Sequence, residues 1–271
     1  MRLRTFFLIL LAVLITWGVV FAQKPFHEYE GEDRGVRLPA DWEKPAEWVS
    51  ARLRYRDAYG GFRGFRGFRQ EGAWATDYPL GDRHLIIGVQ RLTRIHARSV
   101  EQPVELDGTD DLFNWPFLYA VEVGQWSINE KEGKQLRDFL DRGGFLMVDD
   151  FHGVQQWEIF ADGIHQVYPD RQIEDLPGTE PIFHILADVD TKVQVAGLAA
   201  LYYGRTYEQP SDPYPRWRAI YDEKKRITVA ICHNMDLGDA WEHSDEAEYP
   251  ADMAIVAHRA LQNYAMYDLT H

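Results

Sequence analysis

The chain has 271 residues, of which 45% are hydrophobic and nine are Trp, so it can bury a large core. Its formal net charge is −14 at pH 7, with 43 Asp and Glu against 29 Lys and Arg. Binding to nucleic acid or to an anionic membrane needs clustered basic residues, so neither is expected as a main partner. Solubility alone is a sufficient reason for the acidic balance. The single cysteine, Cys232, excludes an intramolecular disulfide, and its place at the end of an apolar run predicts a buried thiol.

Residues 1–22 have the parts of a cleavable secretory signal peptide. Arg2 and Arg4 supply the positive start, an apolar stretch follows, and Ala22 ends a small-residue cleavage site before Gln23. The sequence therefore predicts an exported protein, periplasmic or extracellular after cleavage. The alternative is retention as an inner-membrane anchor, since the stretch is near the lower length limit of a spanning helix.

The rest of the chain is predicted to form one domain. Residues 23–47 are rich in Pro, Glu and Asp without periodicity and are expected to be a poorly ordered lead-in. Residues 48–271 show no change of composition and are assigned to a single α/β domain. Within it, residues 61–69 repeat Gly-Phe-Arg three times, which favours a flexible surface insertion over a polyanion-binding segment.

The first half of the domain alternates predicted strands and helices. Apolar alternation or continuous apolar runs predict strands, and an apolar stripe at helical spacing predicts a helix. The segments are a strand at 48–55, a helix at 79–95, and strands at 100–106 and 116–121. Ser127-Ile128-Asn129-Glu130 is interpreted as a capping box that opens a further helix, which Gly143-Gly144 closes.

The second half continues the pattern. A buried strand at 145–148 leads through a short acidic turn into a helix around 157–160. A short strand at 182–186, a hairpin formed by 217–221 and 226–232, and a last helix from Pro250 follow. This order predicts an α/β fold with a mainly parallel sheet and helices on both faces.

Two polar segments directly follow buried strands of the predicted sheet. They run from Asp149 to Gly153 and from His233 to His243. Ligands of open parallel sheets bind beyond the carboxyl ends of the strands, so these segments form the candidate site. Its mixed carboxylate and imidazole groups fit a divalent metal with a bound water, or a pair for general acid–base work. The catalytic candidates are Asp149, Asp150, His152, His233, Asp236 and Asp239.

A structural role carries equal weight for these residues. Asp149 and Asp150 are also placed to cap the helix near Gly153, and Asp236 and Asp239 to cap the segment before Trp241. In that second turn Gly238 is expected to supply the left-handed residue. The spacing matches no established catalytic motif, so the metal stays unknown and no cofactor is assigned.

Further residues are candidates for binding a ligand. His184 follows a predicted short strand, and Arg171 and Arg205 are candidate clamps for an anionic group. For the histidine a packed or exposed structural role is favoured, and surface salt bridges explain the arginines at least as well. The ligand-binding candidates are His184, Arg171, Arg205, Trp241, Glu242 and His243.

Several motifs together resemble one bacterial family of exported proteins. The segments that carry the resemblance are Asp77-Tyr78-Pro79, 112–119, 143–153, Pro181-Ile182-Phe183-His184 and 232–243. They are similar to the domain of unknown function 4159 family, over roughly residues 48–271. The resemblance implies a flavodoxin-like three-layer sandwich related to class I glutaminase-like domains. It also implies envelope partners with von Willebrand A domains or MoxR-type ATPases, and no established reaction.

The glutaminase comparison points away from glutaminase activity. Class I glutaminases carry a Cys nucleophile on the turn after a buried strand, where this chain has Asp150 and Phe151. No His-x-Glu follows Cys232-His233, so the thioester route is disfavoured. An ester-forming Asp nucleophile at this turn is the remaining variant of covalent catalysis.

Three functional hypotheses follow. The first is an envelope protein that binds a ligand or partner at the carboxyl edge of the sheet. The second is a metal-dependent or acid–base hydrolase acting there on a glycan or peptide. The third is a purely structural component of a membrane-associated complex.

Overall fold

The computed structural model describes Phe26 and residues 36–58 and 72–271. The predicted signal peptide at 1–22 and the Gly-Phe-Arg repeat at 61–69 lie outside the described residues. Among the described helices, none combines the length and apolar character that crossing a membrane requires.

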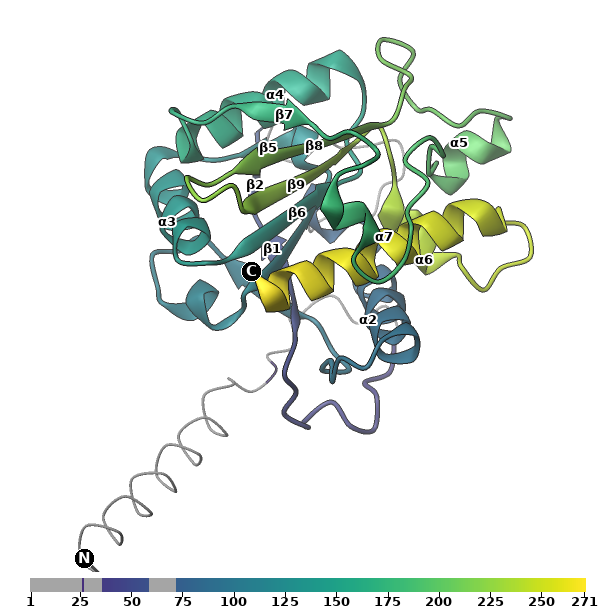
Figure 1. The fold of residues 1–271 in the computed structure, drawn as a ribbon, viewed down its shortest axis with the longest axis horizontal. Coiled ribbons are helices and arrows are strands. Elements are labelled where there is room, and N and C mark those ends of the chain that lie inside the picture. Colours follow the sequence, from purple (N-terminus) through teal and green to yellow (C-terminus); the bar gives the residue numbers. More distant parts are fainter. Residues whose placement is uncertain (1–25, 27–35, 59–71) are drawn as a thin grey trace, which may run out of the picture.

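A seven-stranded sheet forms the centre of the fold, in the order β3-β1-β4-β6-β9-β8-β7 (Figure 1). Neighbouring strands are parallel from β3 to β9, whereas β8 is antiparallel to β9 and β7 is antiparallel to β8. The strands are β1 (Ser50–Arg54), β3 (Gln102–Glu105), β4 (Phe117–Val121), β6 (Phe145–Asp149), β7 (Ile173–Asp175), β8 (Arg216–Tyr221) and β9 (Ile227–His233). A separate antiparallel pair joins β2 (Arg56–Asp57) to β5 (Trp126–Ser127).

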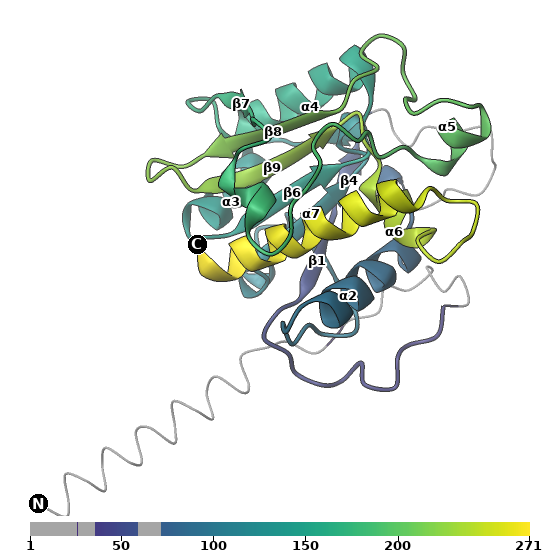
Figure 2. The ribbon, with the colours of Figure 1, turned by 45° about the vertical axis from the view of Figure 1, so that its right-hand side comes forward.

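Helices cover both faces of the sheet (Figures 1 and 2). One face packs against α3 (Glu130–Asp141) and α4 (Gly153–Val167), and the other against α2 (Leu80–Leu92), α6 (Leu237–Glu242) and α7 (Ala251–Thr270). A short helix, α5 (Leu198–Tyr202), lies in the long connection before β8. Four 3-10 turns complete the described elements: η1 (Ala73–Ala75), η2 (Asp111–Asn114), η3 (Val123–Gln125) and η4 (Pro181–His184). The predicted α/β three-layer sandwich is confirmed.

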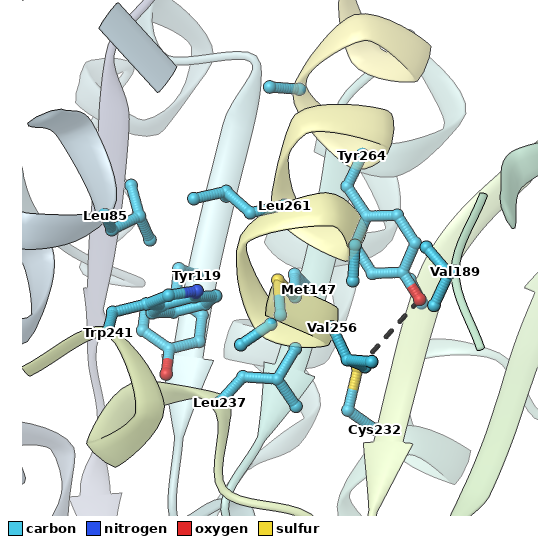
Figure 3. Packing of buried hydrophobic residues seen from close by; sticks show 14 of the residues in the cluster. Leu85, Tyr119, Met147, Val189, Cys232, Leu237, Trp241, Val256, Leu261 and Tyr264 are labelled. Atoms are coloured by element: carbon cyan, nitrogen blue, oxygen red, sulfur yellow. Dashed lines mark hydrogen bonds between the residues drawn. The ribbon is translucent and has the colours of Figure 1, made fainter. Parts of the chain in front are cut away.

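Each face of the sheet has its own apolar core. The two central strands β4 and β6 are buried at every position, as expected for strands covered on both faces. On the α7 side, the Phe145 ring packs 5.7 Å from Phe117 and 5.8 Å from Tyr264. Figure 3 shows Tyr264, Met147 and Leu261 from this core together with Cys232. Alternation along the strands, with Leu146 and Val148 facing the α3–α4 side, fixes the register of the sheet.

Two local predictions are wrong. Helix α3 begins at Glu130 with Asn129 as its N-cap, because Ser127 pairs in β5 and the capping box is formed by Asn129 and Glu132. The predicted strand at 182–186 is instead the 3-10 turn η4, which starts at Pro181 and packs Ile182 and Phe183 against the α7 core. The proline has no backbone N–H to donate to a sheet ladder.

One buried acid near the end of α7 gives a testable prediction. Burial raises the pKa of the Asp268 carboxyl to about 7, from an ordinary value near 3.8. The folded chain therefore holds this proton more tightly than the unfolded chain, so ionisation costs stability as pH rises from about 4 to about 7. We expect Asp268→Asn to increase the free energy of unfolding by about 1–3 kcal/mol at pH 8, and by less at pH 4.5. Urea unfolding at both pH values measures this, and an equal effect at both contradicts it.

Candidate functional site

Three adjacent parallel strands end in acidic residues at one edge of the sheet. Glu122 follows β4, Asp149 and Asp150 stand at the end of β6, and Asp236 follows β9. Backbone hydrogen bonds tie these ends together: the Glu122 N–H donates to the Asp149 carbonyl at 3.0 Å, and the Asp150 N–H to the Met235 carbonyl at 3.1 Å. The carboxyl ends of β4, β6 and β9 therefore form one continuous acidic edge.

The chain turns sharply at this edge. Glu122, Asp150 and Asn234 each follow their strand directly and have φ values of 54°, 53° and 62°. Asp77, in the segment before α2, has φ 60°. Asp and Asn adopt this left-handed conformation more readily than most residues, although it still costs energy. The left-handed residue of the β9 turn is thus Asn234, and the prediction that Gly238 supplies it is wrong.

Three groups of side chains at this edge have the composition of metal ligands. Within each group the ligand atoms lie within 4.8 Å of one another. The first two groups share one residue, Asp150. The groups are Asp150–His152–Glu208, Asp77–Asp150–Asp236 and Asp239–Glu242–His243.

In the first group, His152 lies between two carboxylates. Its Nε2 is 3.0 Å from Asp150 Oδ1 and 3.8 Å from Glu208 Oε2. Burial lowers the pKa of the His152 imidazole to about 3, so the ring is neutral at physiological pH. A neutral imidazole is the form that ligates metals.

Buried carboxylate oxygens at this edge lack hydrogen-bond donors. Asp150 and Asp236 are only 5% and 4% exposed. Asp150 Oδ1 meets His152 and Asp236 Oδ1 accepts the Asp239 N–H at 2.8 Å, whereas the second oxygen of each residue accepts no hydrogen bond among the described residues and is not fully shielded from solvent. Asp77 Oδ2 and Asp149 Oδ1 are buried without a partner there. Buried polar atoms are nearly always satisfied, so these oxygens require an explanation.

Gly197 shows that carboxylates from separate segments face one point. A Cβ atom at Gly197 would lie 2.6 Å from Asp236 Oδ2, 2.7 Å from Glu208 Oε1 and 3.2 Å from Asp239 Oδ2. The backbone there, at φ −63° and ψ 148°, suits any residue. The glycine is therefore needed for space beside the carboxylates and not for its conformational freedom.

Burial raises the pKa of the carboxyls along this edge. For Asp77, Asp150 and Asp236 the pKa lies well above the ordinary value, first through desolvation and then through the neighbouring negative charges. The same two causes raise the pKa of Glu208 to about 7. Only Arg52, for Asp77, and Arg205, for Glu208, act in the opposite direction. The edge carries more negative charge than these basic groups compensate.

The backbone donors of the neighbouring helices are already used. At the start of α4, the Gly153 N–H donates to Asn234 Oδ1 at 2.7 Å and the Val154 N–H to Ser211 Oγ at 3.2 Å. At the start of α6, the Leu237 and Gly238 N–H groups both donate to Asp149 Oδ2. Anions bind at helix N-termini through such donors, so the edge offers acceptors for a cation and few donors for an anion.

These contacts test the predictions about which acidic residues cap the helices. The N-cap of α4 is His152, and neither Asp149 nor Asp150 caps that helix, so this prediction is wrong. Asp149 instead binds the start of α6, because it stands in β6 and points to the face that α6 covers. Asp236 is the N-cap of α6, as predicted.

His233 lies apart from the carboxylates. It is 1% exposed, packs against the Phe151 and Trp157 rings at 4.8 Å and 4.9 Å, and its Nε2 contacts the Gly153 carbonyl at 3.2 Å. Its Nδ1 is 3.3 Å from Arg218, and burial lowers its pKa to about 4. The structure gives His233 packing contacts and places it outside the three ligand groups.

Two of the other predicted ligand-binding residues lie elsewhere. His184 is in η4, where it contacts Asp188 and the Gly178 carbonyl. Arg171 pairs with Asp141 at 2.9 Å and stacks on the Tyr168 ring. The structure does not bring these two residues to the acidic edge.

The remaining predicted residues lie at or near the edge. Arg205 stacks on Tyr203 and on Tyr207 and lowers the pKa of Glu208. Trp241 is fully buried against Tyr119, as Figure 3 shows, so it forms a wall beneath the edge. Glu242 and His243 join Asp239 on α6 in the third group.

Sequence reasoning missed four contributors to the site: Glu122, Asp77, Glu208 and Gly197. Glu122 directly follows β4, so the strand-end pattern could have found it. Glu208 and Gly197 stand in the long connection between α4 and β8, and Asp77 in the segment before α2. No strand end marks these positions. A signal was nevertheless present for Asp77, because it belongs to the Asp-Tyr-Pro motif.

Cys232 has no access to the acidic edge. It is fully buried in β9, its Sγ is 4.0 Å from the Tyr264 hydroxyl (Figure 3), and burial raises the pKa of the thiol well above its ordinary value. Cysteine nucleophiles react as thiolates, so this thiol cannot serve as one. The turn after β6, where a glutaminase nucleophile would stand, holds Asp150.

The fold and the edge define an α/β sandwich protein with a carboxylate-rich site at the ends of its parallel strands. Residues 51–269 match the model of a family described as Domain of unknown function (DUF4159), and the chain belongs to this family. The resemblance of its motifs is thereby confirmed, whereas the relation to class I glutaminases stays a prediction. No curated protein matches the chain.

The crowding at Gly197 can be tested by adding one methyl group. We expect Gly197→Ala to lower the free energy of unfolding by about 1–3 kcal/mol, because the methyl group displaces Asp236 and Glu208. Gly178→Ala is the matched control: its Cβ would lie 2.8 Å from Thr191 Oγ1 in an exposed loop. Urea unfolding measures both variants, and an equal decrease in their free energy of unfolding contradicts the crowding of carboxylates at Gly197.

Proposed function

We propose that the protein binds a divalent cation at the acidic edge and, through it, a ligand in the cell envelope. The observation that carries this proposal is the group of Asp77, Asp150 and Asp236, in which Asp77 Oδ2 is buried without a partner. The second oxygens of Asp150 and Asp236 accept no hydrogen bond among the described residues, and all three residues come from different segments of the chain. A cation supplies the positive charge and the coordination that these oxygens lack.

The contrast with other buried acids supports a cation over a purely structural role. Asp82 is fully buried and pairs with Arg52 at 3.1 Å, and Glu101 is fully buried and pairs with Arg83 and the Tyr78 hydroxyl. In these two cases the fold provides the buried carboxylate with a basic partner. Oxygen ligands favour Mg²⁺, Ca²⁺ or Mn²⁺, and the imidazole of His152 extends the choice toward Zn²⁺.

A cation-dependent or acid–base hydrolase is the second candidate function. The contact of 3.0 Å between His152 Nε2 and Asp150 Oδ1 favours it, because a carboxylate that orients an imidazole is a common arrangement for proton transfer. A cation at this edge would also supply a nucleophilic water.

Export is the other part of the proposal. The charged start, the apolar stretch and the small-residue cleavage site of residues 1–22 support it. The resemblance supports envelope proteins with von Willebrand A domains or MoxR-type ATPases as partners.

The cation is tested by isothermal titration calorimetry of the purified protein with Mn²⁺. We expect stoichiometric binding, and an affinity loss of about tenfold or more in Asp150→Asn, since this change removes a charged ligand. Asp245→Asn, at an exposed position outside the three groups, should bind as the unchanged protein does. Absence of binding to the unchanged protein, or equal losses in both variants, would overturn the proposal.

Export is tested by sequencing the N-terminus of the protein recovered from a bacterial host. We expect a mature chain that starts at Gln23, because Ala22 completes the cleavage site. Ala22→Arg should block processing and leave the longer chain. An unchanged protein that keeps residues 1–22 contradicts cleavage, and recovery from the membrane fraction would then favour the anchor.

A further inference from the structure

We infer that the acidic edge binds two divalent cations side by side, with the Asp150 carboxylate bridging them. This inference rests on the proposed function and adds the number of cations and their arrangement. Its starting point is that Asp150 belongs to two ligand groups, one with His152 and Glu208 and one with Asp77 and Asp236.

Asp150 is suited to a bridging role. Its Oδ1 lies 3.0 Å from His152 Nε2 and so faces the first group. Its second oxygen accepts no hydrogen bond among the described residues, although the side chain is only 7% exposed. A carboxylate with one oxygen toward each group holds two cations roughly 3.5–4 Å apart, the spacing of known two-metal sites.

The two groups border one common space. Asp236 Oδ2 from the second group and Glu208 Oε1 from the first lie 2.6 Å and 2.7 Å from the position of a Cβ atom on Gly197. Asp236 is 4% exposed, and this oxygen has no donor among the described residues. The oxygens that would complete the two cation sites are therefore neighbours, as a bridged pair requires.

The charges also favour two cations. Asp236, Glu208 and Asp239 face this space, and Asp77 and Asp150 share a ligand group with Asp236. Of the two arginines that act on these carboxyls, Arg52 already pairs with Asp82 at 3.1 Å. One dication would leave most of the five carboxylates uncompensated in a buried site, and a second brings the charges close to balance.

A bridged pair also indicates the class of ligand. Without cations the acidic edge repels anions, and the first N–H groups of α4 and α6 already donate to Asn234, Ser211 and Asp149. Two adjacent cations bind an oxyanion across both metals. The ligand class is thus a molecule with a phosphate or carboxylate group, whose binding depends on the cations.

The number of cations is measured by calorimetry and by electron paramagnetic resonance of the Mn²⁺-loaded full chain. We expect two Mn²⁺ per chain and a spectrum of two exchange-coupled ions. His152→Ala and Asp77→Asn should each leave one uncoupled Mn²⁺, since each removes a ligand of a different group. Asp245→Asn should keep both ions, and circular dichroism verifies that each variant is folded.

The outcomes separate this inference from the proposed function. One Mn²⁺ in the unchanged protein, or two without coupling, overturns the bridge and leaves the cation site standing. Loss of the second ion in Glu242→Gln but not in His152→Ala places that ion on α6 and also overturns the bridge. No Mn²⁺ at all overturns both.

The oxyanion is tested with inorganic phosphate as the probe. We expect phosphate to bind to the Mn²⁺-loaded protein and not to the cation-free protein. Acetate is the second probe and tests whether a carboxylate group binds in the same cation-dependent way. Phosphate or acetate binding that is equal with and without Mn²⁺ contradicts the ligand class, and so does the absence of binding by both.

Discussion

The structure depends on the burial of carboxylates at the ends of three adjacent parallel strands. Removing a carboxylate from water is costly unless hydrogen bonds or opposite charges replace the solvent. Asp149 receives two backbone N–H groups from α6 and lies 3.4 Å from the Tyr119 hydroxyl. Asp150 and Asp236, equally buried, receive one contact each. The fold therefore gives one oxygen of Asp149 three contacts and one oxygen of each of the other two carboxylates a single contact.

A buried arginine, Arg52, connects the acidic edge to the segment before α2. Arg52, in the middle of β1, donates to the carbonyls of Trp74 and Thr76 and lies 4.8 Å from the Tyr119 ring centre. These carbonyls directly precede Asp77, so Arg52 sets the position of that residue at the acidic edge. It pairs with Asp82 at 3.1 Å and also lowers the pKa of Asp77. The arginine therefore positions a carboxylate of the site and offsets part of its charge.

The sequence predicts those parts of the fold that depend on local patterns. The apolar runs of β4, β6 and β9 identify buried strands, and acidic residues directly after a buried strand must lie at its carboxyl end. This logic finds Asp149, Asp150 and Asp236. It cannot find Glu208 or Asp77, because their approach to the edge depends on tertiary packing of long connections. The same logic wrongly places His184 near a strand end, because the apolar residues after Pro181 predict a strand where the structure has the 3-10 turn η4.

The adjacent residues Asp149 and Asp150 show why local patterns do not assign roles. Asp149 is the last residue of β6 and continues the alternation of Phe145 and Met147, so its side chain points to the face covered by α6. Asp150 leaves the strand in the left-handed conformation, which turns its side chain toward His152 and the acidic edge. The difference in backbone conformation thus makes Asp149 a capping residue and Asp150 a candidate ligand.

The turn at Asp150 is also the point of comparison with glutaminases. A sharp turn between a strand and a helix exposes whichever side chain stands there, and in many α/β enzymes that side chain is a nucleophile. Here the turn presents a carboxylate among other carboxylates, while the Gly153 and Val154 N–H groups beside it donate to Asn234 and Ser211. These two donors are therefore not available to an oxyanion formed by attack on a carbonyl. The geometry is better suited to holding cations than to covalent catalysis.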